Sequence, residues 1–234
     1  MEETKKIRLS PRLQACAEYV PQGSSLADVG TDHAYLPVWL IQNGRVRTPV
    51  VACDINEGPL DRARKSAREY GVESELVFML NNGLAGTKAE LAETVVIAGM
   101  GGETIMDIIT AARWNWEGHT LILQPMSKIY ELCRGLYENG FYIEKERLVR
   151  DAGEIYRVLL VKPGKRELPD PLELYAGKSD REEPLYKEYV GGLIKKFSRM
   201  EKGMAASEKA DAALLEETRA LLGAALELGK ELGI

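Results

Sequence analysis

Asp28-Val-Gly-Thr-Asp-His-Ala-Tyr-Leu-Pro37 follows directly on an apolar run that begins at Leu26. The run predicts a strand over Leu26–Val29, and the apolar residues Leu36–Ile41 predict a helix after the turn. A glycine between a strand and a helix lets the backbone approach a ligand at the carboxyl edge of a parallel sheet. This stretch therefore predicts an α/β fold with a nucleotide-type pocket at the turn.

Outward from this turn, β-branched runs alternate with amphipathic stretches up to about Gly164, as in a parallel sheet covered by helices. The predicted strands are Leu26–Val29, Val50–Ile55, Leu76–Leu80, Val95–Ala98 and Leu121–Leu123. The predicted helices are Pro11–Val20, Pro59–Tyr70, Glu103–Ala112 and Ile129–Glu138. Tyr142–Val149 and Ile155–Val161 predict a terminal hairpin around the loop Arg150–Glu154. We therefore expect a Rossmann-like, seven-stranded sheet.

The composition changes past Pro163-Gly164, where Pro169 and Pro171 mark a linker and charged helix formers dominate afterwards. Two apolar stripes recur there at steps of three and four residues, which predicts an antiparallel helical hairpin of the coiled-coil type. The stripes are Tyr186, Val190, Leu193, Phe197, Met200 and Met204, and Leu214, Thr218, Leu221, Ala225 and Leu228. We expect a catalytic domain over residues 1–165 and a helical domain over residues 166–234.

The whole-chain composition limits the function. The 234 residues contain no apolar run of the roughly 20 residues that span a bilayer. Cys16, Cys53 and Cys133 are far apart and lie in apolar surroundings, which favours reduced thiols, and His33 and His119 are too few to suggest a zinc site. We expect a cytoplasmic protein, a monomer or weak dimer, without membrane or metal partners. A net charge of −5 argues against indiscriminate nucleic-acid binding but leaves room for a local basic face.

Asp28 and Asp32 determine which nucleotide ligand the first turn favours. A dinucleotide site usually has several glycines here to hold a pyrophosphate, whereas this turn has one glycine and two carboxylates. Carboxylates repel a pyrophosphate but suit the sulfonium and ammonium groups of S-adenosylmethionine (SAM). We therefore expect SAM as the cofactor, although Asp28 alone is also compatible with a capping or turn residue.

Further candidates for cofactor contacts follow the other predicted strands. Asp54 ends the second strand, where a carboxylate can accept both ribose hydroxyls of an adenosine ligand. Asn82-Gly83 can meet the adenine edge or form an ordinary left-handed turn, and Ala98-Gly-Met-Gly-Gly102 can admit a ligand or serve as a tight packing turn. The full set of expected cofactor-binding residues is Asp28, Gly30, Thr31, His33, Asp54, Ile55, Asn82, Gly83, Gly99, Met100 and Gly101.

Other polar and aromatic residues are candidates for substrate contacts. Gln124 and Pro125 end the fifth strand, where the amide of Gln124 can read a base edge. Tyr35 can stack on an extruded base or pack under the following helix, and His33 can border the pocket or be a structural histidine. In the tail, Lys195, Lys196 and Arg199 can follow a phosphate backbone, or the helix that carries them is only a packing element.

Together, Asp28–Pro37, Ala98–Gly102 and Leu121-Ile-Leu-Gln-Pro125 resemble the bacterial TrmK family, the tRNA (adenine-22-N1)-methyltransferases. Leu9-Ser-Pro-Arg-Leu-Gln14 looks like the family's opening, and the helical tail fits its C-terminal coiled-coil domain. The resemblance implies a class I SAM-dependent fold, methyl transfer to adenine N1 in the D arm of tRNA, and a catalytic carboxylate at Asp32. Asn82 departs from the aspartate that the family usually has there, which puts the strength of cofactor binding in question.

The chemistry leaves two other functions open. Adenine N1 carries an in-plane lone pair, so its methylation needs no base to free the nucleophile, and Asp32 can stabilise the positive charge that the ring acquires. A SAM-binding RNA-interaction protein with weak or lost catalysis is one alternative, and a small-molecule methyltransferase is the other.

Overall fold

The computed structural model describes residues 5–178, 183–207 and 211–234. They form two compact units, of which the first ends at Glu167 and the second begins at Leu168. The strands are β1 Leu26–Val29, β2 Val50–Asp54, β3 Leu76–Leu80, β4 Thr94–Gly101, β5 Thr120–Ser127, β6 Phe141–Asp151 and β7 Glu154–Pro163. The α-helices are α1 Pro11–Tyr19, α2 Tyr35–Gln42, α3 Glu57–Glu69, α4 Gly102–Ala111, α5 Ile129–Glu138, α6 Pro171–Ala176, α7 Pro184–Ala205 and α8 Ala212–Leu232. Two short 3₁₀ helices are η1 Glu73–Glu75 and η2 Ala89–Leu91.

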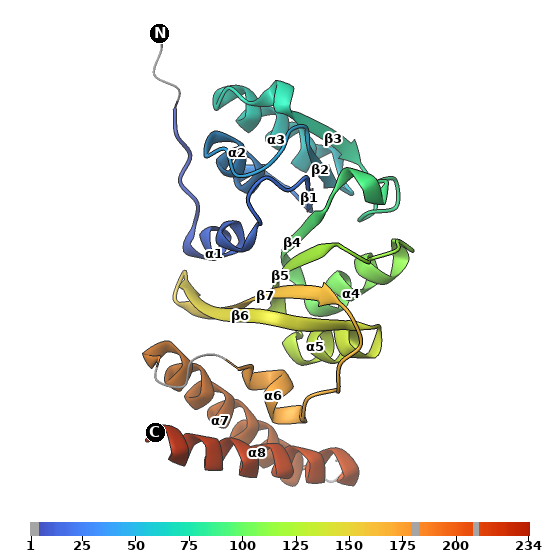
Figure 1. The fold of residues 1–234 in the computed structure, drawn as a ribbon. Coiled ribbons are helices and arrows are strands. Elements are labelled where there is room, and N and C mark those ends of the chain that lie inside the picture. The colour runs from blue at the N-terminus through green and yellow to red at the C-terminus, as the bar shows by residue number, and fades with distance from the viewer. Residues whose placement is uncertain (1–4, 179–182, 208–210) are drawn as a thin grey trace. The chain divides into compact units, whose positions relative to one another are not determined.

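The seven strands of the first unit form one sheet in the order β3-β2-β1-β4-β5-β7-β6 (Figure 1). β1 pairs in parallel with β2 on one side and with β4 on the other, and β7 is antiparallel to both β5 and β6. Because the strand order reverses between β1 and β4, the chain leaves their carboxyl ends in opposite directions and a crevice forms there. The predicted Rossmann-like seven-stranded sheet is confirmed.

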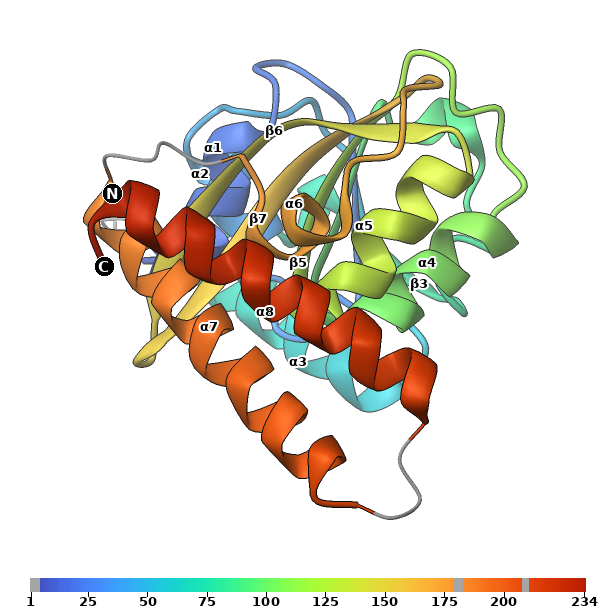
Figure 2. The same ribbon diagram turned by 90° about the horizontal axis from the view of Figure 1, so that it is seen from below.

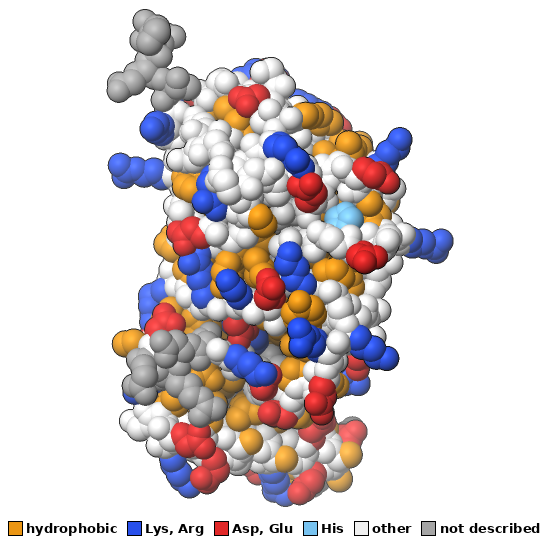
Figure 3. Space-filling model, viewed as in Figure 1, with side chains coloured by type: hydrophobic (Ala, Val, Ile, Leu, Met, Phe, Trp, Pro, Cys, Tyr) orange, Lys and Arg blue, Asp and Glu red, His pale blue; other side chains and the backbone are white. Residues whose placement is uncertain are grey.

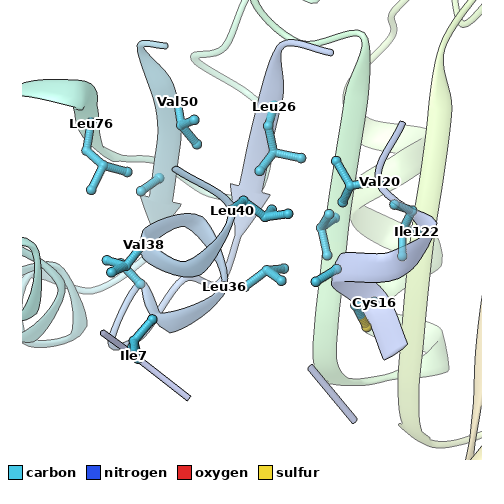
Figure 4. Packing of buried hydrophobic residues seen from close by; sticks show 14 of the residues in the cluster. Ile7, Cys16, Val20, Leu26, Leu36, Val38, Leu40, Val50, Leu76 and Ile122 are labelled. Carbon is cyan, nitrogen blue, oxygen red and sulfur yellow. The ribbon is translucent and has the colours of Figure 1, made fainter. Parts of the chain in front are cut away.

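Helices cover both faces of this sheet. Side chains of α1 and α2 pack on every second residue of the central strands, including Leu26, Val50 and Ile122 (Figure 4). Because successive strand residues point to opposite faces, the intervening apolar residues face the other side, where α4 and α5 contact β5 (Figure 2). The central strands β1, β2 and β5 are therefore largely buried on both faces, and polar groups that bind a ligand are expected where the parallel strands end.

Three details of the first unit differ from the sequence prediction. β4 extends beyond the predicted end at Ala98 to Gly101, so Gly99 and Gly101 lie within the strand. The loop of the terminal hairpin is only Ala152-Gly153, because both residues adopt positive φ and close a two-residue turn between paired Asp151 and Glu154. β5 also extends beyond Leu123 to Ser127, since Pro125 lies at a register shift in its pairing with β4.

The second unit contains α6, α7 and α8. The segment predicted as a linker forms α6, because the Asp170 side chain accepts a hydrogen bond from the Glu173 N–H and Pro171 begins the helix. α7 and α8 pack side by side (Figure 2), and contacts pair Glu201 with Arg219 and Ile194 with Gly229, so the two helices are antiparallel. The predicted stripe of α7 is buried from Tyr186 to Phe197, whereas Leu214 of α8 is exposed.

Gly102 lies where α4 and α5 pack closely, so a side chain there should reduce stability. A Cβ at this first residue of α4 would overlap the carbonyl oxygen of Lys128 and lie 2.9 Å from Cβ of Leu132, so α5 would have to move. We expect Gly102→Ala to lower the free energy of unfolding by about 1–3 kcal/mol. Urea unfolding followed by tryptophan fluorescence measures this, because all three tryptophans lie in the first unit.

Gly58→Ala is the matched control. Gly58 is the second residue of α3, and a Cβ there would meet only the Arg62 side chain, at 3.8 Å. This substitution should leave stability unchanged or raise it by less than about 1 kcal/mol. Equal effects of the two substitutions would contradict the packing argument for α4 and α5.

Candidate active site

The turn after β1 is held by the neighbouring strand. The backbone N–H groups of Gly30 and Thr31 both donate to the carbonyl oxygen of Cys53, at 2.8 and 3.0 Å. Gly30 has φ +74°, and Asp32 and Ala34 adopt positive φ as well. Left-handed backbone is costly for residues other than glycine, so the contacts of the turn must hold it in this shape.

A pocket of about 320 Å³ opens at this turn, between the carboxyl ends of β1 and β4. It brings together seven of the residues predicted from the sequence: Asp28, Gly30, Thr31, Asp32, His33, Tyr35 and Gly99. Arg12, Leu13, Leu36 and Ala98 complete its lining. Residues far apart in the chain therefore meet in one pocket, at the place where open α/β sheets bind their ligands.

Asp28 is the buried carboxylate of this pocket, with 6% of its surface exposed. Burial raises its pKa to about 6, and the negative charge of Asp54 acts in the same direction. A cationic ligand group placed beside Asp28 would reverse this effect and favour the ionised form. The carboxylate is therefore suited to bind a positively charged group.

Asp32, by contrast, lies at the solvent-facing side of the pocket, and its side chain is 56% exposed. Its Oδ1 accepts hydrogen bonds from both Nε and Nη2 of Arg62 in α3, the first at 3.0 Å. Its Oδ2 lies 3.8 Å from Nε2 of His33. An ion pair this exposed contributes less than about 1 kcal/mol, so a ligand can displace Arg62 at little cost.

Two aromatic rings stand beside this carboxylate. The rings of His33 and Tyr35 are stacked, with centroids 5.0 Å apart and an angle of 21° between their planes. Tyr35 is 40% exposed although it begins α2, so part of its ring faces solvent rather than packing under the helix. The two rings offer a flat surface at the side of the pocket that holds Asp32.

The second and third strands end outside the lining of this pocket. Oδ1 of Asp54 accepts a hydrogen bond from the Asn56 N–H, and the neighbouring Ile55 is 59% exposed. Asn82 is exposed, whereas Gly83 is buried with φ +60°, and a Cβ there would lie 3.0 Å from the Ile108 side chain. Gly83 is therefore a packed residue in a left-handed turn. The accessible side chains on the β2 side of β1 are those of Asp54, Ile55 and Asn82.

The glycines at the junction of β4 and α4 divide between packing and the pocket. Gly99 has φ +81° and lines the pocket, while Gly102 packs against α5. A Cβ on Gly30 would overlap the methyl group of Met100, so the Met100 thioether covers this glycine. A Cβ on Gly101 would lie 3.4 Å from Oγ of Ser127 in β5.

Gln124 requires a correction. Its side chain is fully buried, with Oε1 accepting from Nη1 of Arg12 at 2.6 Å and from the Gly99 N–H at 3.1 Å. Its Nε2 donates to the carbonyl oxygen of Pro125, which is buried as well. Both ends of the amide are occupied, so Gln124 and Pro125 do not present a base-reading edge to the pocket.

The predicted cations of the tail lie on α7. Lys195 and Arg199 are exposed, and the ammonium of Lys196 lies 4.9 Å from the centroid of the Tyr175 ring. Acidic and basic side chains are interspersed over the face that Figure 3 shows. Binding of a phosphate backbone would therefore depend on a local group of cations such as Lys195, Lys196 and Arg199.

Arg12 and Arg62 belong to the site but were not predicted as site residues. Arg12 lies in the Leu9–Gln14 segment that resembles the family's opening, and this resemblance was the available signal. Arg62 carries no local signal, because its contact with Asp32 depends on how α3 packs beside the turn.

The described residues were also compared with three other kinds of functional feature: a membrane-spanning helix, a metal site and a reactive cysteine. Within the described ranges, no helix has both the length and the apolar character needed to cross a membrane. No group of three His, Cys, Asp or Glu side chains in that part of the chain is arranged to hold a metal ion. The three cysteines are buried and unpaired, and burial raises the pKa of Cys16 and of Cys53 to about 12, so neither is a reactive thiolate.

Comparison with known proteins identifies the family. Residues 9–159 match the family described as "Methyltransferase domain". The chain is 34% identical over 174 residues to the tRNA (adenine(22)-N(1))-methyltransferase of Bacillus subtilis, covering 74% of this chain and 73% of that protein.

Solved structures agree with this match. The structure of the m1A22 tRNA methyltransferase TrmK of B. subtilis is similar with a TM-score of 0.82 and 26% identity, covering 97% of this chain and 99% of that one. Sp1610 of Streptococcus pneumoniae, solved in complex with S-adenosyl-L-methionine, is similar with a TM-score of 0.82 and 27% identity, covering 95% and 100%. The present chain therefore belongs to the tRNA (adenine(22)-N(1))-methyltransferase family.

Proposed function

We propose that this chain transfers a methyl group from SAM to N1 of adenine 22 in the D arm of tRNA, acting in the cytoplasm as a monomer or weak dimer. The observation that carries the proposal is the pocket at the end of β1, where a buried carboxylate, Asp28, adjoins an exposed one, Asp32. The B. subtilis relative that covers 74% of this chain bears the same activity in its name.

The residues present fit the cofactor. SAM supplies an activated methyl group on a sulfonium. Asp28 is suited to its ammonium group by charge and burial, and Gly30 lines the pocket beside it without a side chain to fill the space. Asp54 can accept from the ribose hydroxyls, with Ile55 and Asn82 flanking the adenine on the same side of β1 and the buried Gly83 shaping the turn beneath them.

Asp32 and Tyr35 are assigned to the substrate base. Adenine N1 needs no deprotonation before it attacks, so the chain's task is to position the base and stabilise the charge that develops on it. Asp32 can accept from the exocyclic N6 amine once Arg62 releases it, and the exposed ring of Tyr35 can stack on the extruded base. Lys195, Lys196 and Arg199 are assigned to the tRNA backbone.

The reaction itself is tested by incubating the protein with unmodified tRNA and methyl-labelled SAM, followed by mass-spectrometric mapping. We expect one N1-methyladenosine at position 22. No methylation of several tRNAs that carry adenine 22, despite measurable SAM binding, would favour a binding protein with lost catalysis. Methylation at another position would contradict the assigned specificity.

For Asp32, we expect Asp32→Ala to lower kcat by about 100-fold, because one preorganised group that stabilises the transition state is lost. The Kd for SAM should change by less than about threefold, since Asp32 is assigned to the base. Asp61→Asn, which also removes an exposed carboxylate beside an α3 arginine, is the control and should leave kcat unchanged. Near-normal kcat in Asp32→Ala would remove Asp32 from catalysis.

For Asp28, the raised pKa predicts a pH dependence of SAM binding. As the pH falls through about 6, Asp28 takes up a proton and loses the charge that attracts the ligand. The Kd for SAM, measured by calorimetry, should therefore be about tenfold higher at pH 5 than at pH 7.5. In Asp28→Asn the Kd should be nearly independent of pH. An unchanged pH dependence in Asp28→Asn would assign the titration to another group.

For the tail, we expect the triple substitution Lys195→Gln, Lys196→Gln and Arg199→Gln to weaken tRNA binding without changing SAM binding. The slope of log K against log salt should become shallower by about 2–3, because each phosphate contact contributes about 0.9. Replacing Lys187, Arg219 and Lys230 by Gln removes the same charge elsewhere on α7 and α8 and is the control. Equal effects of the two triple variants would indicate general electrostatics rather than a defined contact.

A further inference from the structure

Arg12 is a cationic side chain inside the pocket for which the proposed function has no role. It lies in the first turn of α1 and lines the pocket together with Asp28, Gly30 and Gly99. A Cβ on Gly99 would lie 3.4 Å from Nη1 of Arg12, so the guanidinium lies against this glycine. The side chain is 23% exposed, and it is therefore largely withdrawn from bulk solvent.

Two neighbours, the fully buried Gln124 and the partly buried Asp151, hold the guanidinium. Oε1 of Gln124 accepts from Nη1 at 2.6 Å, and Oδ2 of Asp151 lies 3.7 Å from Nε and accepts from the backbone N–H of Arg12 at 3.3 Å. Gln124 is fully buried, and Oδ2 of Asp151 is held at the tip of the β6–β7 hairpin. The orientation of the arginine is therefore set before any ligand arrives.

This fixation leaves donors free. An arginine side chain carries five N–H groups, and among the described residues Nη2 of Arg12 has no hydrogen-bond partner. A partly buried guanidinium with unused, preoriented N–H groups is the arrangement that binds a carboxylate through two parallel hydrogen bonds.

The strand order indicates which part of the ligand reaches Arg12. Asp54, suited to the ribose, ends β2 on one side of β1, whereas Gly99 lies near the carboxyl end of β4, the neighbour on the other side. A ligand that lies across the end of β1 with its ribose toward β2 has its other end toward β4. For SAM that other end is an amino acid, whose ammonium suits Asp28 and whose carboxylate suits a cation.

We propose that Arg12 binds the carboxylate of the methionine moiety of SAM, and that Gln124 and Asp151 are positioning residues that orient its guanidinium. The proposal rests on the proposed function, because it takes SAM as the ligand. In this proposal the buried Gln124 amide orients Arg12 and does not contact the substrate base.

The ligand itself provides the first test. Calorimetry compares SAM with decarboxylated SAM, which keeps the sulfonium and the amine but has hydrogen in place of the carboxylate. The wild-type protein should bind SAM about tenfold or more tightly than the decarboxylated compound, the difference expected for hydrogen bonds to a charged group. Equal affinities would overturn the proposal without requiring any variant to fold.

Variants provide the second test. Arg12→Met should weaken SAM binding by about tenfold and change the affinity for decarboxylated SAM by less than about twofold, and Arg12→Lys should fall between it and the wild type. Arg8→Met is the matched control, because Arg8 is an exposed arginine that precedes α1 and is absent from the pocket lining. Tryptophan fluorescence melts confirm that each variant is folded.

The remaining outcomes distinguish a failure of the role of Arg12 from a failure of the proposed function. If Arg12→Met weakens both ligands equally, or weakens tRNA binding and leaves SAM binding intact, Arg12 does not bind the carboxylate and the proposal is overturned. A wild-type protein that binds neither ligand contradicts the proposed function, and the inference falls with it. A wild-type protein that binds both ligands equally refutes only the role of Arg12.

Discussion

The carbonyl oxygen of Cys53 is the contact on which the site depends. By accepting the N–H groups of Gly30 and Thr31, it ties the turn after β1 to the end of β2 and leaves no backbone donor of these two residues free. The turn can then pass through three left-handed residues, Gly30, Asp32 and Ala34, before α2 begins. This path leaves Asp28 beneath the turn and Asp32 on its outer side, so one short segment presents two carboxylates in different environments.

The difference between these environments explains how one pocket can serve two ligands. Asp28 is buried, and burial raises its pKa because the charged form loses hydration, an effect that a cationic ligand would oppose. Asp32 is exposed and already paired with Arg62, so a substrate must compete with that arginine rather than with desolvation. The buried site therefore suits a small ligand enclosed by the protein, and the exposed one suits a base that arrives on a macromolecule.

Most of the fold was predictable, because hydrophobic periodicity and glycine turns determine the order and type of the elements in the first unit. The misses were local: α6 was read as a linker although Asp170-Pro171 is a helix-start signal, and the hairpin loop was predicted five residues long instead of two. In the site, residues of one continuous turn were predicted to act together and do meet in one pocket. Gln124 was misassigned and Arg62 was missed, because burial of an amide and contacts between α3 and the turn arise only from tertiary packing.

The central claim is that the end of β1 is the methyl-donor site, with the ligand lying across it from β2 to β4. A crystal structure of the protein with S-adenosylhomocysteine tests this most directly. The account predicts that the ribose hydroxyls lie within hydrogen-bond distance of Asp54 and that the amino-acid end lies in the pocket beside Asp28. A ligand bound elsewhere, or bound with its amino-acid end toward β2, would contradict the account.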